Sequence, residues 1–262
     1  HNCNIVESKQ FTDQQNGHFF IRQSFTLINY DILNKLEDDL LILSKDLNAE
    51  FFLSDIQRSM NTIMLVSKFD HCLNDLLYRV RNNSLNLNIK AIVSNHRIAE
   101  EIANFSNIPF YYIPIDKSNK EEQELKIKNL IIKNHIEMIV LARYMQVLSE
   151  EFTKEFEGKI INIHHSFLPS FKGAKPYHQA FERGVKVIGA TAHYVTSDLD
   201  EGPIIEQDTQ EVDHEMMPNN LVAIGRDIES RVLYRALKAH SERRVFLNGN
   251  RTVVFKGHRL LG

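Results

Sequence analysis

The sequence predicts an α/β protein with a mostly parallel sheet, preceded by a smaller α+β unit. From Asn61 onward, short apolar runs alternate with amphipathic segments, which is typical of a parallel sheet covered by helices on both faces. Before residue 57 the order differs, because two strand-like segments precede a single helix. The polar stretch Gln57-Arg58-Ser59 separates the two patterns, so we expect domains over residues 1–57 and 58–262.

The N-terminal unit begins with two predicted strands on either side of the sequence DQQNG. Residues 3–11 and 18–28 are rich in β-branched and aromatic side chains, and an Asn-Gly pair between such runs indicates a hairpin. Residues 31–47 place leucine and isoleucine on one helical face, with Asp31 in position to cap the helix. Residues 50–56 are predicted to form another strand.

The second unit is predicted to contain strands that at first alternate with helices. The strands are expected at 61–67, 89–94, 109–115, 137–143, 159–164, 186–195 and 203–212. The helices are expected at 73–82, 97–106, 120–134 and 219–244. A final hairpin is expected around Asn248-Gly249. Ligands of such sheets bind beyond the carboxyl ends of the strands, so the site is expected there.

Composition and charge disfavour several classes of function. The 31 basic and 34 acidic residues give a net charge of −3, which argues against a surface for nucleic acid or anionic membrane. No apolar run approaches the length of about 18 residues that a membrane span needs. Cys3 and Cys72 are too few and too scattered for a disulfide framework or a zinc site. We therefore expect a cytoplasmic protein that binds neither nucleic acid nor a membrane.

The distribution of glycine argues against a nucleotide cofactor. No glycine occurs between Gly17 and Gly158, and the turn after the strand at 61–67 is Ser67-Lys68-Phe69-Asp70-His71. A turn that binds a dinucleotide or a phosphate needs glycines so that the backbone can approach the ligand closely. The sequence thus disfavours both a nicotinamide site and a P-loop.

Two later strands bring polar side chains to one edge of the sheet. Asn162 and His164 are two positions apart near the end of one strand, so their side chains share a face. Thr191 and His193 share a face of the next strand for the same reason. The turn SDLDEGP follows and presents two aspartates near these side chains.

An Asn, a His and an Asp that meet at strand ends suit attack on a carbonyl carbon. The amide of Asn162 can donate to a developing oxyanion. His164 can move a proton or stabilise the charged intermediate. Asp200 can orient or charge the histidine and can help to deprotonate the nucleophile. Polar residues at strand ends also serve as caps and turns, but this combination favours catalysis.

The same residues carry a resemblance to a known superfamily. Asn162-Ile163-His164, followed by Ser166, Leu168-Pro169 and Gly173 and then by GATAHYVTSDLDEGPII, resembles the signature of the folate-dependent formyltransferases. Within that superfamily, His165, the run GAKPYHQAFERGVKVIGATAHYV and the motif SKxxHCLxDLL resemble the formyltetrahydrofolate deformylase family. The resemblance covers nearly the whole chain and implies a Rossmann-like catalytic domain.

The resemblance implies a reaction and a set of site residues. It implies hydrolysis of 10-formyltetrahydrofolate to tetrahydrofolate and formate, which supplies formate for purine synthesis and balances the one-carbon folate pool, with no cofactor. The catalytic residues would be Asn162, His164 and Asp200. The folate-binding residues would be Arg143, Met145, Gln146, Val147, Leu148, Thr191, His193, Asp198 and Leu199. Relatives usually carry Arg at the position of Gln146, so a salt bridge to the folate glutamate is in doubt.

The first 56 residues resemble an ACT regulatory domain, which is ferredoxin-like. That resemblance implies an amino-acid effector and a homo-oligomer. An ACT domain has the order βαββαβ, whereas only ββαβ is predicted here. We therefore expect the natural polypeptide to extend upstream by about 20–30 residues, the length of a strand, a helix and their connections.

Three other functions are open at this point. The first is formyl transfer to an amine acceptor such as glycinamide ribonucleotide. The second is a metallohydrolase that uses His164, His165, His178 or His193 with Asp200, which the opposite directions of adjacent strand residues disfavour. The third is a non-catalytic sensor of amino acids, which would leave the Asn–His–Asp set without a purpose.

Several neighbouring residues also have a structural interpretation. His165 is expected to make a structural hydrogen bond, and His193 is expected either to support the site or to lie in the core. His71 begins a helix or closes the acceptor side of the site. Cys72 is interpreted as a small apolar filler, and the helix at 219–244 as a packing or subunit element.

Overall fold

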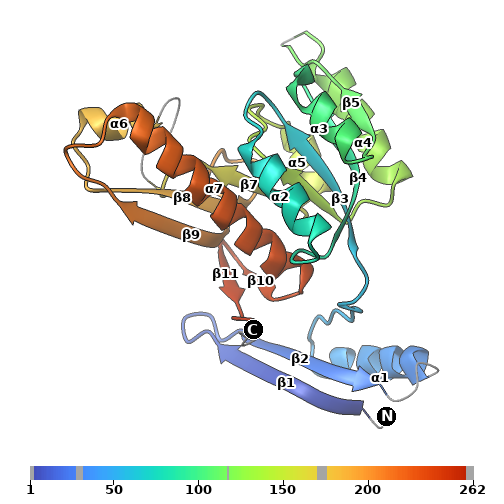
Figure 1. The fold of residues 1–262 in the computed structure, drawn as a ribbon. Coiled ribbons are helices and arrows are strands. Elements are labelled where there is room, and N and C mark those ends of the chain that lie inside the picture. Colours follow the sequence, from blue (N-terminus) through green and yellow to red (C-terminus); the bar gives the residue numbers. More distant parts are fainter. Residues whose placement is uncertain (1–2, 28–31, 117, 170–175, 258–262) are drawn as a thin grey trace.

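A computed structural model describes residues 3–27, 32–116, 118–169 and 176–257 (Figure 1). The N-terminal unit lies at the bottom of that view, and the larger α/β domain lies above it. Asp31, the predicted helix cap, and Gly173, part of the predicted motif, lie outside the described residues. No helix among the described residues is long and apolar enough to cross a membrane.

The N-terminal unit consists of a hairpin and a helix. The antiparallel strands β1 (Cys3–Thr12) and β2 (Phe19–Leu27) flank a turn in which Gly17 has a φ of 73°. That backbone conformation costs glycine little, so the Asn-Gly signal predicted the hairpin correctly. The helix α1 (Leu33–Asp46) follows, as predicted, but none of its residues is buried.

The strand predicted at 50–56 is wrong. Residues 47–59 contain neither helix nor strand, and the aromatic ring of Phe52 lies 4.3 Å from the guanidinium carbon of Arg243. Strand propensity describes how a side chain fits a sheet, and a strand forms only where a neighbour takes up its backbone hydrogen bonds. Among the described residues, β1 pairs only with β2, so the segment has no such neighbour.

A seven-stranded sheet forms the centre of the larger domain, in the order β5-β4-β3-β6-β7-β8-β9. Pairing is parallel from β5 to β7 and antiparallel for the last two strands, which confirms a mostly parallel sheet. The strands are β3 (Met60–Val66), β4 (Leu87–Ser94), β5 (Phe110–Tyr112), β6 (Met138–Leu141), β7 (Ile160–His164), β8 (Val187–Tyr194) and β9 (Ile204–Glu211).

Helices cover both faces of the sheet. One core packs α2, α3, α6 and α7 against it, and a second core packs α4 and α5 against the other face. The long α7 crosses one face diagonally (Figure 1). The helices are α2 (His71–Arg81), the 3-10 helix η2 (Arg97–Ala99), α3 (Glu100–Phe105), α4 (Lys120–Lys133), α5 (Glu150–Glu155), α6 (Pro176–Glu182) and α7 (Pro218–Ser241).

The strand order places a topological switch point between β3 and β6. The chain runs outward from β3 to β5 and then returns to add β6 and β7 on the other side. The loops at the carboxyl ends of β3 and β6 therefore diverge and leave room for a ligand between them. Those loops lead to His71, the first residue of α2, and to Arg143, which has a φ of 64°.

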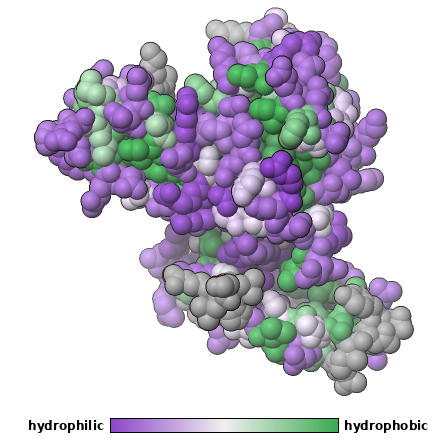
Figure 2. All heavy atoms as spheres, in the orientation of Figure 1, coloured by the Kyte–Doolittle hydropathy of each residue, from purple (hydrophilic) through white to green (hydrophobic). Residues whose placement is uncertain are grey.

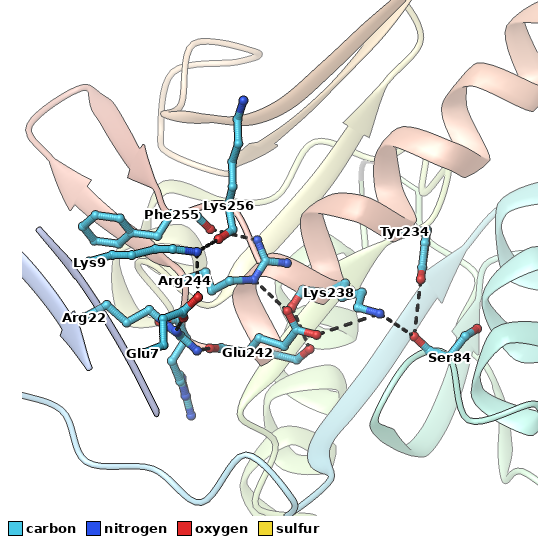
Figure 3. Close-up of polar contacts among 12 residues, drawn as sticks. Glu7, Lys9, Arg22, Ser84, Tyr234, Lys238, Glu242, Arg244, Phe255 and Lys256 are labelled. Carbon is cyan, nitrogen blue, oxygen red and sulfur yellow. Dashed lines mark hydrogen bonds and ion pairs between the residues drawn. The ribbon is translucent and has the colours of Figure 1, made fainter. Parts of the chain in front are cut away.

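The N-terminal hairpin contacts the C-terminal end of the larger domain. The predicted C-terminal hairpin is present as β10 (Val245–Asn248) and β11 (Arg251–Val254). Figure 3 shows Arg22 of β2 beside Glu242, to whose backbone carbonyl it donates at 3.2 Å, and beside Glu7 of β1. Lys9 donates to the carbonyl of Lys256 in the same view. Arg22 thus joins the hairpin to the end of α7, and Lys9 joins it to the segment after β11.

Candidate active site

Antiparallel pairing of β7 with β8 assembles the predicted polar face. Asn162 lies opposite His193, and His164 lies opposite Thr191. Directly opposed residues of two strands point to the same side of the sheet. All four side chains therefore share one face near the carboxyl end of β7, as the sequence predicted.

Asp200 reaches this face from the turn after β8. One of its carboxylate oxygens lies 3.2 Å from Nδ1 of His164, and the other lies 3.8 Å from Nε2 of His193. The turn packs closely against β8 at Gly202. A Cβ atom added at this glycine would lie 1.7 Å from the carbonyl oxygen of Tyr194. Only glycine permits this approach, so Gly202 fixes the position of the aspartate.

The partners of His193 define its protonation. Its Nδ1 lies 2.8 Å from the carbonyl oxygen of Tyr194, which can only accept, so Nδ1 carries the proton. Burial lowers the pKa of His193, so the ring is neutral and its Nε2 is an acceptor. Nδ2 of Asn162 donates to that nitrogen at 3.3 Å. His193 therefore orients the Asn162 amide and supports the site.

The ring of His164 is oriented in a similar way. Its Nδ1 faces Asp200, and its Nε2 is buried with no hydrogen-bond partner among the described residues. Burial raises the pKa of Asp200, but the hydrogen bond and charge of His164 outweigh it, so the net pKa lies below its ordinary value. An ionised carboxylate thus holds one nitrogen of His164, while the other has no hydrogen-bond partner among the described residues.

The residues predicted to bind folate fall into two groups. Met145 is 51% exposed and Leu199 is 63% exposed, and these lie in the loop after β6 and in the turn that carries Asp200. Val147 and Asp198 are exposed as well, and Gln146 is half-buried. The other four predicted residues are buried: Arg143, Leu148, Thr191 and His193.

The buried members of that set have protein partners. The hydroxyl of Thr191 donates to the carbonyl of Ser166 at 2.9 Å and accepts from the backbone N–H of Leu168 at 3.0 Å. Thr191 thus holds the loop after β7 in place. Leu148 belongs to the core beneath α5, and the Arg143 side chain enters a cluster on the other side of the loop.

That cluster centres on Glu229, which the sequence interpretation missed. Glu229 lies on α7, is 1% exposed, and accepts from the Tyr177 hydroxyl at 2.7 Å and from Nε2 of His71 at 2.8 Å. Nε of Arg143 lies 3.3 Å from the same carboxylate. The one sequence signal was a carboxylate on the apolar stripe of the long helix, next to Ile228.

The same cluster contains the one group of potential metal ligands found among the described residues. His71, Cys72 and Glu229 offer ligand atoms within 4.8 Å of one another. The guanidinium of Arg143 already faces the carboxylate, which disfavours a second cation. Burial and then the charge of Glu229 raise the pKa of the Cys72 thiol, so it is not a thiolate. These contacts already satisfy the Glu229 carboxylate, so the cluster is not assigned as a metal site.

Comparison with known families agrees with this fold. A family model described as formyl transferase matches residues 60–237, which contain the central sheet and the Asn162–His164–Asp200 face. A phosphoribosylglycinamide formyltransferase from Anaplasma phagocytophilum has a TM-score of 0.69 and 27% identity, over 78% of this chain and 98% of that one. Fold and site thus define a protein of the formyl transferase class.

Nearer relatives share almost the full length. Formyltetrahydrofolate deformylase of Corynebacterium sp. (strain P-1) is 47% identical over 98% of this chain and 90% of the relative. The formyltetrahydrofolate deformylase of Bacillus subtilis is 43% identical over 97% of this chain and 86% of the relative. The crystal structure of the formyltetrahydrofolate deformylase from Burkholderia mallei matches with a TM-score of 0.93 and 46% identity. The match covers 98% of this chain and 91% of that one. The chain belongs to the formyltetrahydrofolate deformylase family.

Proposed function

We propose that the protein hydrolyses 10-formyltetrahydrofolate to tetrahydrofolate and formate, and so supplies formate for purine synthesis while balancing the one-carbon folate pool. The observation that carries this proposal is the buried Nε2 of His164, which has no hydrogen-bond partner among the described residues while Asp200 holds Nδ1. Asn162 lies on the same face and is oriented by His193. Full-length similarity to proteins named formyltetrahydrofolate deformylase supports the choice of substrate.

The three proposed catalytic residues have distinct roles. Asn162 donates from its amide to the oxygen of the formyl group as negative charge develops there. Nε2 of His164 takes a proton from the attacking water, and Asp200 stabilises the resulting imidazolium. The water oxygen bonds to the formyl carbon, the bond from carbon to N10 breaks, and N10 receives the proton that His164 took from the water. Formate leaves after its own proton passes to solvent.

The folate would lie along the loop after β6 and the turn before β9. The exposed side chains of Met145, Val147 and Leu199 supply apolar surface there, with Asp198 beside them. Gln146 would face the glutamate tail. The buried residues of the predicted set would support the folate pocket from inside the protein: Arg143, Leu148, Thr191 and His193. No cofactor is assigned, because folate is the substrate.

The runner-up is formyl transfer to an amine such as glycinamide ribonucleotide. The similarity to phosphoribosylglycinamide formyltransferases favours it, whereas the turn after β3, without glycine, disfavours a phosphate-bearing acceptor. The test is an assay of formate and tetrahydrofolate with and without that amine, and with a chelator. The proposal predicts equal amounts of both products without amine and no effect of the chelator. Turnover that requires the amine would support transfer instead.

We infer that residues 1–57 form part of an ACT-like unit that pairs with a second copy of the chain. Exposed apolar side chains gather on this unit, and Figure 2 shows green patches at the bottom of the view. They include Ile5, Val6, Phe11, Phe19, Ile21, Leu41, Ile42, Leu43, Leu47 and Phe52. Such a patch marks an interaction surface. Light scattering should give a homo-oligomer, and a monomeric mass would contradict the inference.

We expect an amino-acid effector to bind the ACT-like unit, and calorimetry with the free amino acids would detect it. A cytoplasmic location agrees with the lack of a membrane-spanning helix among the described residues, and fractionation of cells would test it.

A further inference from the structure

The last residue of β8 lies between the catalytic face and α7. Tyr194 follows His193 in the strand, and adjacent residues of a strand point to opposite faces of the sheet. His193 therefore lies beside Asn162, whereas the buried side chain of Tyr194 belongs to the core that α7 covers. The main chain of Tyr194 thus borders the site while its side chain is held from the other face.

The main chain of Tyr194 holds two parts of the site. Its carbonyl oxygen accepts from Nδ1 of His193 at 2.8 Å, and this bond fixes the tautomer whose Nε2 accepts from Asn162. Its backbone N–H donates to the carbonyl of Pro203 at 2.9 Å, which closes the turn that carries Asp200. A shift of Tyr194 would therefore displace the Asn162 amide and the Asp200 carboxylate together.

The hydroxyl of Tyr194 is hydrogen-bonded to a histidine in the last turn of α7. It lies 2.7 Å from Nδ1 of His240, and the two rings meet edge to face with centroids 5.7 Å apart. Burial lowers the pKa of His240 to about 4, so the ring is neutral at neutral pH. Nε2 of His240 is buried and has no hydrogen-bond partner in the part of the chain that the structure describes.

The end of α7 is held in place, so His240 can fix the position of another residue. The last carbonyls of a helix have no partner within the helix, and helix ends fray for that reason. Here the carbonyl of His240 accepts from the N–H of Arg243 at 3.0 Å. Arg22 of β2 donates to the carbonyls of Arg243 and Glu242 at 3.2 Å each, and Figure 3 shows Arg22 beside Glu242.

Stability alone does not account for a buried pair of this kind. Two apolar side chains of the same shape could fill the space without the cost of removing polar groups from water. A hydrogen bond, unlike apolar packing, has a preferred direction and so selects one position of Tyr194. Catalysis depends on such selection, because a displaced oxyanion donor or proton acceptor loses much of its effect.

We propose that Tyr194 and His240 are positioning residues for the reaction. Their hydrogen bond fixes the main chain at the end of β8, and that main chain fixes the tautomer of His193 and the turn that carries Asp200. Neither residue touches the substrate. This proposal rests on the hydrolase function proposed above.

The first test removes one hydroxyl. Tyr194→Phe should lower the turnover of formyltetrahydrofolate by about 10-fold, because the Asn162 amide and Asp200 are then less well placed. The Michaelis constant should change by less than about twofold, because the folate surface is untouched. Tyr234→Phe is the matched control: it removes a hydroxyl of the same helix that contacts the carbonyl of Ser84, and it should behave as the wild type. Equal turnover of Tyr194→Phe and this control would overturn the proposal.

Two variants of the partner separate the hydrogen bond from packing. His240→Asn returns a polar atom near the position of Nδ1, whereas His240→Leu fills more of the space with apolar groups. His240→Leu should lose as much turnover as Tyr194→Phe, and His240→Asn should recover part of that loss. A purely structural role predicts the opposite order, so turnover of His240→Leu equal to or above that of His240→Asn would contradict the proposal.

The second test measures the tautomer directly. Long-range nitrogen–proton correlation spectra of protein labelled with nitrogen-15 in its histidines distinguish the two neutral forms, and His193→Gln identifies the signals of His193. The wild type should carry the His193 proton on Nδ1 alone. Tyr194→Phe should show both tautomers, because the hydrogen bond that selects one of them is weakened. A single, unchanged tautomer in Tyr194→Phe would overturn the proposal. This measurement needs no folate, so its result is independent of whether the wild type is a hydrolase.

Discussion

Nδ1 of His164 lies 3.2 Å from a carboxylate oxygen of Asp200, and Nε2 of the same ring is buried without a partner among the described residues. An unpartnered buried nitrogen costs free energy, which a site can recover when a substrate group binds. Asp200 itself is held by the turn that Gly202 presses against β8.

Asn162→Ala should lower turnover on the order of 100-fold or more, because it removes a donor to the developing oxyanion. Asn104→Ala, an exposed position on α3, is the matched control and should have no effect. Steady-state rates of formate release provide the measurement. Turnover of Asn162→Ala close to that of the wild type would remove Asn162 from the catalytic set.

Asp200→Asn should lower turnover by about 100-fold or more, because a neutral amide cannot stabilise the imidazolium of His164. His164→Ala should be at least as damaging. The double variant should lose little beyond the worse single variant if the two residues act as one unit. Near-normal turnover of Asp200→Asn, or fully additive losses, would contradict the assigned roles.

Gln146→Arg should lower the Michaelis constant for polyglutamylated folate more than it changes turnover. Arginine can form a charged, bidentate pair with a carboxylate, whereas the Gln146 amide cannot. Gln146 is half-buried in the loop after β6, so the change adds charge at the rim of the pocket. If neither kinetic parameter changes, the glutamate tail binds elsewhere.

The free energy of unfolding should decrease as the pH is lowered, because His165 is buried in its neutral form. Burial, reinforced by Arg143, lowers its pKa from 6.5 to about 3. The unfolded chain takes up a proton as the pH falls through 6.5, whereas the folded protein does so only near 3. The contribution of His165 to the free energy of unfolding should therefore be fully present above pH 6.5. Below pH 6.5 this contribution should decrease by about 1.4 kcal/mol for each pH unit.

Urea unfolding of the wild type and His165→Gln at pH 5.5 and 4.5 measures that contribution. The wild type should lose about 1.4 kcal/mol more than the variant over this interval. The pKa of His240 is also lowered, to about 4, mainly by burial, but this residue is present in both proteins and its effect cancels. Identical losses in the two proteins would show that His165 is not a buried neutral group.

Local patterns predicted much of the fold and part of the site. The two-residue period of strands placed Asn162 with His164 and Thr191 with His193, and pairing of β7 with β8 joined the two sets. The two Asn-Gly pairs predicted both hairpins correctly, because the conformation of a turn depends on the residues within it.

Features that depend on distant residues could not be predicted in this way. The apolar segment at 50–56 has the composition of a strand but lacks a neighbour among the described residues. Glu229 was not identified from the sequence, because its partners come from α2, α6 and the loop after β6. No local pattern shows that four separate segments meet at one carboxylate.

Hydrolysis in water enriched with oxygen-18 tests the central claim most directly. The purified protein is incubated with 10-formyltetrahydrofolate in buffer without any amine acceptor, and the formate is analysed by mass spectrometry. Because water attacks the formyl carbon, the formate should carry a single labelled oxygen and should appear in the same amount as tetrahydrofolate. Unlabelled formate, or no turnover until an amine is added, would contradict the hydrolase assignment.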